Sequence, residues 1–249
     1  RFICLFFVSL LFVGLIGGLL SRFGSSDNNQ YEDEQAEKNI DFSTMTFSAL
    51  GDSITYGQGI STPYTTVLSD ILGFKNTYNY GVGWSTCSVI TNCKCHGTGA
   101  DKHRAMVNRY SLINAKSDII AVMCGTNDAF LAPLGSMGDT SNDTFYGALT
   151  NLVVGLKNKY KSSYIFFMTT FNYGNTDTPY DENVTHEDYI RKAVINVCSR
   201  YDIDVFDTFK EVPFDKTVNT VDGVHPTQDF VTNVWSPAIA DFIKTHYGK

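Results

Sequence analysis

Basic residues are scarce in this sequence: 19 lysines and arginines stand against 26 aspartates and glutamates, and the formal net charge is −7. A protein that binds a nucleic-acid backbone needs clustered lysines and arginines to displace counterions from the phosphates. Nucleic acid is therefore not expected as a partner. Hydrophobic residues make up 43% of the 249 residues, which is enough for a full core.

Three common signature motifs are also missing. There is no Gly-x-Ser-x-Gly elbow; the nearest stretch, GWSTC at residues 83–87, ends in cysteine instead of glycine. There is no P-loop, and GVG at residues 81–83 lacks the third glycine of a dinucleotide-binding motif. The usual α/β-hydrolase and nucleotide-binding signatures are thereby excluded, and no cofactor is expected.

Charged residues are absent from residues 2–20, an apolar run that as a helix would be about 28 Å long, close to the ~30 Å core of a bilayer. For residues 1–24 an uncleaved membrane anchor, a signal peptide and a buried helix remain open, because Arg1 and Arg22 flank the run on both sides. The chain does not begin with methionine, so we expect its natural N-terminus to lie upstream or to have been trimmed. Either of the first two alternatives places the remaining chain outside the cytoplasm, with membrane contact through this segment only.

Apolar residues are scarce in the next segment, where Asn, Gln, Asp and Glu dominate. Such a composition cannot offset the entropy lost when a chain becomes ordered. We therefore predict a linker at residues 25–43, followed by one domain at residues 44–249. The oligomeric state is left open.

The remaining chain alternates short apolar runs with longer segments of helical periodicity, which is typical of β-α-β units and a parallel sheet. We therefore expect an α/β fold: a three-layer α/β/α sandwich around a doubly wound sheet of about five parallel strands, with ligands bound at the carboxyl ends of the strands. The predicted strands are residues 46–50, 77–80, 119–124, 164–169 and 204–206, and the predicted helices are residues 64–72, 103–114, 144–160, 186–201 and a last one within 228–247.

Cysteines are few, six in total, and three of them lie close together at positions 87, 93 and 95. A local disulfide from Cys87 to Cys93 or to Cys95 is the favoured interpretation in an exported protein. Adding His96 gives four potential zinc ligands, but their spacing is tighter than zinc sites use, so no metal is expected. The cysteines in predicted core elements are expected to be buried free thiols: Cys124 and Cys198.

A serine and a histidine in two distant segments predict the chemistry. Ser53 follows the first predicted strand, and His225 lies three residues after Asp222. A serine hydroxyl is a weak nucleophile until an imidazole accepts its proton and an acid orients that imidazole. One turn can bring the Asp222 carboxylate to the His225 ring and leave the other ring nitrogen facing Ser53. The pattern predicts a serine esterase.

Four separated blocks carry a family resemblance. They are GDSITYG at residues 51–57, NYGVG at 79–83, GTND at 125–128 and DGVHP at 222–226. In this order they resemble the SGNH or GDSL-type hydrolases, esterases and acylhydrolases of flavodoxin-like fold, and the resemblance covers residues 47–247. It implies an enzyme that acts on ester bonds, with Ser53, His225 and Asp222 as its catalytic residues.

The same resemblance implies an oxyanion hole. Its donors would be the backbone N–H of Ser53, the backbone N–H of Gly81 and the side-chain amide of Asn127. Each has a plainer alternative: Ser53 or Asn127 as a helix N-cap, and Gly81 as a turn glycine. Such donors stabilise the charge that develops on a carbonyl oxygen during acyl transfer.

Four residues beside these blocks are candidates for the substrate pocket: Asp52, Tyr56, Trp84 and Asp128. For the two aspartates, hydrogen bonds to their own loops are the stronger alternative. For the two aromatic residues, stacking on a sugar and packing in the core remain equally open.

The expected function is hydrolysis of a small acyl ester, with O-acetyl groups on carbohydrate as the first candidate by analogy with the family. Two alternatives remain open: an O-acyltransferase that uses the same acyl-serine intermediate, and a catalytically silent glycan-binding module.

Overall fold

The computed structural model describes residues 40–90, 104–174 and 187–249. Asn39–Lys249 forms one compact unit built on a parallel sheet with the strand order β2-β1-β3-β4-β5. Because the order reverses between β1 and β3, the connections lie on opposite faces of the sheet, and the carboxyl ends of these two strands border the crevice where such folds bind ligands. The strands are β1 (Thr46–Gly51), β2 (Asn76–Gly81), β3 (Ile119–Met123), β4 (Tyr164–Met168) and β5 (Asp204–Phe206).

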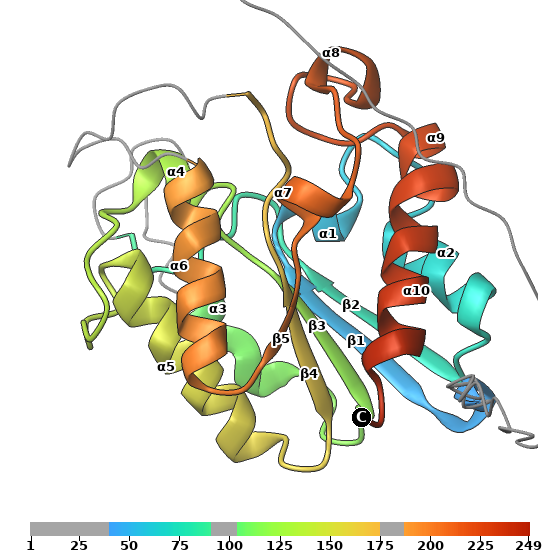
Figure 1. Ribbon diagram of the computed structural model, residues 1–249, viewed down its shortest axis with the longest axis horizontal. Coiled ribbons are helices and arrows are strands. Elements are labelled where there is room, and N and C mark those ends of the chain that lie inside the picture. The colour runs from blue at the N-terminus through green and yellow to red at the C-terminus, as the bar shows by residue number, and fades with distance from the viewer. Residues whose placement is uncertain (1–39, 91–103, 175–186) are drawn as a thin grey trace, which may run out of the picture. The chain divides into compact units, whose positions relative to one another are not determined.

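Helices cover both faces of the sheet (Figure 1). One face packs against α2 (Tyr64–Leu72) and α10 (Ser236–His246), and the other packs against α3 (Met106–Arg109), α5 (Phe145–Lys159) and α6 (Glu187–Arg200). The short elements are η1 (Phe42–Thr44), α1 (Ser53–Tyr56), η4 (Tyr110–Leu112), α4 (Asp128–Leu131), α7 (Thr208–Glu211), α8 (Lys216–Asn219), α9 (Gln228–Phe230) and the π-helical turn η5 (Val231–Trp235).

The central strand β3 explains why the strands are so apolar. Ile119, Ala121 and Met123 belong to the core on the α2 and α10 side, whereas Ile120 and Val122 belong to the core on the other side. All five side chains are fully buried. Strands of a parallel sheet covered on both faces must be apolar at successive positions, as this one is.

The predicted three-layer α/β sandwich is confirmed, and the five predicted strands end within one residue of the observed ones. The single helix predicted for residues 103–114 is wrong. In the described part of that range the chain forms α3 and then η4, and Arg109, the last residue of α3, has φ −123° and ψ −2°. At this break the Arg109 side chain donates hydrogen bonds to the interior carbonyl groups of Tyr80 and Gly51.

The folded domain begins earlier than predicted, as the position of Phe42 shows. Its side chain is buried, and its ring lies 5.5 Å from the Phe74 ring and 6.1 Å from the Tyr247 ring, centre to centre. The folded unit therefore begins before residue 44, and the predicted linker at residues 25–43 is too long at its end. The predicted anchor or signal peptide, residues 1–24, lies outside the described residues. Among the helices of the described ranges, none has the length and apolar character needed to cross a bilayer.

The cysteines correct a second prediction. Cys87 is a buried free thiol, so the disulfide predicted from it is wrong in this structure. Its position explains why: its side chain is packed in the core beside β3, and its backbone N–H donates to the Asp128 carboxylate at 2.8 Å. Cys93, Cys95 and His96 lie outside the described residues. The predicted buried free thiols are confirmed at Cys124 and Cys198.

Candidate active site

The serine lies on a tight turn at the carboxyl end of β1. Asp52 caps α1, because its Oδ1 accepts a hydrogen bond from the Ile54 N–H at 2.9 Å. Ser53 is the first helical residue, so the alternative in which Ser53 itself is the N-cap is wrong. An N–H in the first turn of a helix has no acceptor within that helix. The turn thus presents both the hydroxyl and the backbone N–H of Ser53 beyond the sheet.

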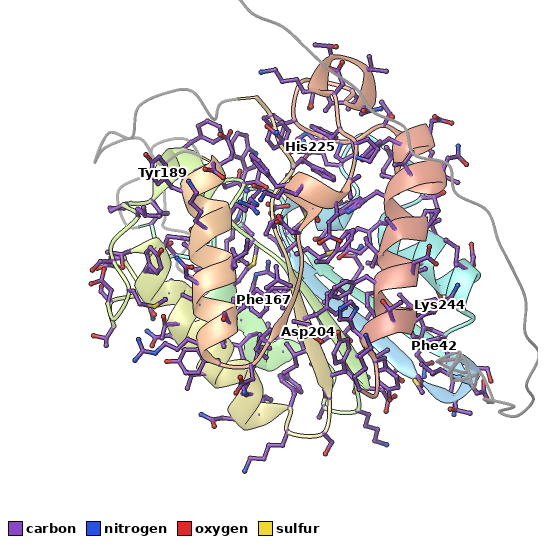
Figure 2. All side chains as sticks on the ribbon, in the orientation of Figure 1. Phe42, Phe167, Tyr189, Asp204, His225 and Lys244 are labelled. Atoms are coloured by element: carbon purple, nitrogen blue, oxygen red, sulfur yellow. The ribbon has the colours of Figure 1, made fainter. Side chains whose placement is uncertain are left out.

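A short C-terminal loop brings the histidine to this serine. The Asp222 Oδ1 accepts hydrogen bonds from the backbone N–H groups of Val224 (3.1 Å) and His225 (2.8 Å), which folds the loop around the carboxylate. The other carboxylate oxygen, Oδ2, lies 2.7 Å from His225 Nδ1, and His225 Nε2 lies 2.8 Å from Ser53 Oγ. His225 lies at the end of the sheet that carries α1 (Figure 2). The three predicted side chains are therefore joined in one line of hydrogen bonds.

The charge state of Asp222 fits this line. Burial raises its pKa, but the hydrogen bonds from the backbone and ring of His225 and from the Val224 N–H lower it by more, so the net pKa is below the ordinary value. An ionised carboxylate accepts the proton on Nδ1 of the imidazole. That tautomer leaves Nε2 as the acceptor for the Ser53 hydroxyl.

Tyr173 holds the histidine loop from outside it. Its hydroxyl donates to the Val224 carbonyl at 3.0 Å, and the Val221 N–H donates to the His225 carbonyl at 2.9 Å. Burial raises the pKa of Tyr173, so its hydroxyl remains a donor at neutral pH. The sequence offered no signal for this residue, which is 51 positions upstream of Val224, whose carbonyl it bonds.

Asn127 occupies the N-cap position of α4, but its side chain does not cap the helix. Its side chain makes no capping hydrogen bond; instead Nδ2 donates to the Ser85 carbonyl at 2.9 Å. A carboxamide has two N–H donors, so this bond fixes the amide and leaves a second donor. The N-cap alternative is therefore right about the position of Asn127 but wrong about a capping role for its side chain.

Gly81 has a different role from the one predicted. Its N–H donates to Asn79 Oδ1 at 2.8 Å, so the donor needed for an oxyanion is already engaged within its own loop. A Cβ atom at this position would lie 2.1 Å from the backbone nitrogen of Tyr56. Glycine is required here because β2 approaches α1 closely, and this contact packs the second block against the serine turn.

The two aspartates predicted for the substrate pocket are fully buried, so that prediction is wrong for both. Asp52 caps α1, as described above. Asp128 accepts hydrogen bonds from the N–H groups of Cys87 (2.8 Å) and Ser88 (3.0 Å) and from the Ser88 hydroxyl (2.6 Å). Both therefore hold their loops, which was the stronger alternative.

The two aromatic candidates are exposed. Tyr56 is 60% exposed and Trp84 is 52% exposed, so neither belongs to the core. Trp84 occupies the left-handed region at φ 62°, inside a turn closed by the Ser85 N–H and the Val82 carbonyl at 3.1 Å. This conformation is costly for a residue with a side chain and is concentrated at functional sites. Their role in binding stays a prediction.

Asp52 gives a pH-dependent prediction. Burial raises its pKa to about 6, although the hydrogen bond from the Ile54 N–H lowers it. In the unfolded chain the same group has a pKa near 3.9, so the folded chain holds the proton more tightly and loses stability as the pH rises from about 4 to about 6. The loss amounts to about 3 kcal/mol.

Asp52→Asn keeps a capping oxygen but has no carboxyl to ionise. We expect the free energy of unfolding of the wild type, relative to this variant, to fall as the pH rises between 4 and 6. Urea denaturation of both proteins at several pH values measures the difference. A difference that stays constant over this interval would show that Asp52 does not titrate there.

The fold and the site define the class of the protein: an α/β enzyme with a serine, histidine and aspartate joined beyond the carboxyl end of a parallel sheet. The chain belongs to the GDSL-like lipase/acylhydrolase family, whose model matches residues 49–230. It is therefore an ester-bond hydrolase. No curated protein matches the chain.

Solved structures share the fold. A protein from Lactobacillus plantarum aligns with a TM-score of 0.69 at 24% identity, over 82% of this chain and 98% of that one. A carbohydrate acetylesterase family member from Sinorhizobium meliloti aligns with a TM-score of 0.57 at 18% identity, over 83% and 100% of the two chains. A variant of an acetyl-xylooligosaccharide esterase from Geobacillus aligns with a TM-score of 0.57 at 19% identity, over 84% and 97%.

Proposed function

We propose that the chain hydrolyses small acyl esters through an acyl-serine intermediate. The Ser53 hydroxyl attacks the ester carbonyl while His225 Nε2 accepts its proton, and Asp222 orients the ring and stabilises the imidazolium. His225 then donates the proton to the leaving alcohol, and water attacks the acyl-serine by the reverse sequence. The observation that carries the proposal is the continuous line from Asp222 through His225 to Ser53, with distances of 2.7 and 2.8 Å.

The test of this proposal compares the purified chain with Ser53→Ala. We expect the wild type to release p-nitrophenol from p-nitrophenyl acetate and Ser53→Ala to lose nearly all of that activity. Equal rates in both proteins would contradict the mechanism. A second assay adds a glycan acceptor and measures both free acetate and acetylated glycan. Faster release of acetate supports hydrolysis, and faster acetylation of the glycan supports a transferase.

Two donors are proposed for the oxyanion. They are the backbone N–H of Ser53, at the start of α1, and the second N–H of the Asn127 amide, which the bond to the Ser85 carbonyl holds in place. Fixed donors of this kind are often the largest contribution to the rate of acyl transfer. Gly81 is not included, because its N–H is engaged with Asn79.

Asn127→Ala is expected to lower kcat by about 100- to 1000-fold with a small change in KM, because the lost donor acts mainly in the transition state. Steady-state kinetics with p-nitrophenyl acetate measure both constants. Asn151→Ala is the matched control, since that amide bonds to the Thr140 carbonyl and the Asn142 side chain. We expect it to keep the wild-type kcat. Loss of binding alone in Asn127→Ala would contradict the proposed role.

We propose acetylated carbohydrate as the substrate class. Two of the structural neighbours are a carbohydrate acetylesterase family member and an acetyl-xylooligosaccharide esterase. Three exposed aromatic residues lie on the segments that carry the site: Tyr56 on α1, Trp84 in the turn before Ser85, and Phe130 on α4. Aromatic rings offer flat apolar faces that suit a sugar ring.

Tyr56→Ala tests this substrate class. We expect KM for an acetylated xylooligosaccharide to rise about tenfold, the effect of losing roughly 1.4 kcal/mol of binding. KM for p-nitrophenyl acetate is expected to change by less than about twofold, because this substrate has no sugar ring for Tyr56 to contact. Tyr78→Ala, which removes an exposed tyrosine from the middle of β2, is the control. Equal effects of Tyr56→Ala on both substrates would argue against a sugar-binding role.

A further inference from the structure

A single buried arginine connects the segments that form the site. Arg109 is 7% exposed and is the last residue of α3, and its side chain donates four hydrogen bonds to neutral acceptors. Its Nη1 donates to the Tyr80 carbonyl at 2.6 Å, and its Nη2 donates to the Gly51 carbonyl at 2.6 Å and to the Ser85 hydroxyl at 2.9 Å. The fourth bond runs from Nε to the Arg104 carbonyl at 3.1 Å.

Two of the four acceptors, the Gly51 carbonyl and the Ser85 hydroxyl, belong to residues connected to the proposed mechanism. Gly51 ends β1, two residues before Ser53. Its carbonyl also accepts from the Val82 N–H at 3.1 Å, so this one oxygen joins β1 to the loop after β2. The guanidinium therefore fixes the base of the serine turn.

The second connection leads to the oxyanion donor. Arg109 holds the Ser85 side chain, and the carbonyl of the same residue accepts the Asn127 amide at 2.9 Å. Moving Ser85 would therefore move the group that aims Asn127. Through one planar side chain, the serine turn and the asparagine amide are held relative to each other.

We propose that Arg109 is a positioning residue that sets the geometry between Ser53 and the oxyanion donor Asn127. This inference rests on the proposed function. It explains why a charged side chain occupies an interior position at all. A buried charge is costly to desolvate, and an apolar side chain of similar volume would fill the same space without that cost. The fork of N–H groups on a guanidinium, however, can hold several carbonyl groups at fixed angles, which a packing residue cannot do.

The charge persists in this environment. Burial lowers the pKa of Arg109 to about 10, and the negative charge of Asp52 raises it in turn. Arg109 is therefore protonated at neutral pH, and all of its donors are present. Three of the four acceptors are backbone carbonyls, so the position of the guanidinium does not depend on the side chains that contact substrate.

The test compares Arg109→Met with Arg191→Met, using p-nitrophenyl acetate under conditions where circular dichroism shows both variants folded. Arg191 is an equally buried arginine whose partners are Asp207 and Asp188. Arg109→Met is expected to lower kcat by about 100-fold, because a displacement of about 1 Å at reacting groups has an effect of this size. Its KM is expected to change less than about threefold, and Arg191→Met is expected to keep the wild-type kcat although it lowers the melting temperature.

Two further measurements separate positioning from general stability. Guanidinium chloride at low millimolar concentration is expected to raise kcat of Arg109→Ala about tenfold by occupying the vacated site, whereas sodium chloride at the same concentration is not. Arg109→Lys keeps the charge but not the planar fork, and its kcat is expected to lie about tenfold below that of the wild type. If Arg109→Met does not fold, Arg109→Lys decides the question.

The inference is overturned if Arg109→Met or Arg109→Lys has the wild-type kcat, or if Arg191→Met loses kcat equally. Ser53→Ala in the same assay distinguishes failure of the role proposed for Arg109 from failure of the proposed function. If Ser53→Ala retains the wild-type rate, the proposed mechanism fails whatever the arginine variants do. If Ser53→Ala is inactive and Arg109→Met is fully active, only the role of Arg109 is lost.

Discussion

His225→Ala is expected to lower kcat by about 10⁶-fold, the size of the loss found when the histidine base of a serine-hydrolase triad is removed. The ring nitrogen Nε2 lies 2.8 Å from Ser53 Oγ, and no other part of the mechanism can accept the serine proton. Without that acceptor, the hydroxyl remains a weak nucleophile at neutral pH. The loss is expected in kcat for every ester, whatever its alcohol, because proton transfer is common to all of them.

The control for this variant is His246→Ala. The His246 ring stacks on Phe242 at the end of α10, with ring centres 4.1 Å apart, and its Nδ1 lies 2.9 Å from the Phe242 carbonyl oxygen. It is expected to keep the wild-type kcat. Steady-state kinetics with p-nitrophenyl acetate compare the two variants directly. More than a tenth of the wild-type kcat in folded His225→Ala would show that another group acts as the base.

Asp222→Asn is expected to lower kcat by about 10⁴-fold while the loop keeps its shape. The asparagine oxygen can still accept the N–H groups of Val224 and His225, which Asp222 Oδ1 accepts now. The asparagine NH₂ group, however, would face His225 Nδ1 in place of the carboxylate oxygen Oδ2, and it donates a hydrogen bond where that oxygen accepted one. The imidazole then places its proton on Nε2, which faces Ser53 and can no longer accept the serine proton.

Asp215→Asn is the matched control for this loss. Asp215 caps α8 through a hydrogen bond from the Thr217 N–H at 2.8 Å, in the same way that Asp222 holds its own loop. We expect full activity in Asp215→Asn and an unchanged melting temperature in Asp222→Asn within a few degrees. If Asp222→Asn hydrolyses p-nitrophenyl acetate at the wild-type rate, the orienting role of Asp222 is wrong.

The alternation of strands and helices was predictable from the sequence. Strands such as residues 119–124 are apolar at successive positions, because both faces of a parallel sheet are covered, and that pattern is visible in the sequence. The serine and the Asp222 to His225 spacing were also predictable, since a single turn determines how the aspartate reaches the ring. In both cases the signal lies in residue types and spacings that the sequence shows directly.

Two other roles were not predictable, because they depend on backbone hydrogen bonds and on packing that residue types and spacings do not show. Gly81 looked like an oxyanion donor because the spacing of its block does not show that Asn79 takes its N–H or that Tyr56 lies against it. Cys87 looked like a disulfide partner because its neighbours in sequence are cysteines, whereas its neighbours in space are the core beside β3 and the Asp128 carboxylate.

Arg109 shows the same limit most clearly. It lies in a segment with helical periodicity, and nothing in its immediate sequence indicates that its side chain turns inward. Its acceptors are the carbonyls of Gly51 and Tyr80, 58 and 29 residues away. Backbone carbonyls carry no residue-specific signal, so a side chain that binds them cannot be identified from residue types alone.

The most direct test of the mechanism is the reaction of the folded wild-type chain with a fluorophosphonate, followed by peptide mass spectrometry. We predict one covalent adduct per chain, on the peptide that contains Ser53, with no adduct in Ser53→Ala and much slower labelling in His225→Ala. Hydrolysis of p-nitrophenyl acetate by a folded chain that carries its adduct on another residue, or none at all, would contradict the assignment of Ser53 as the nucleophile.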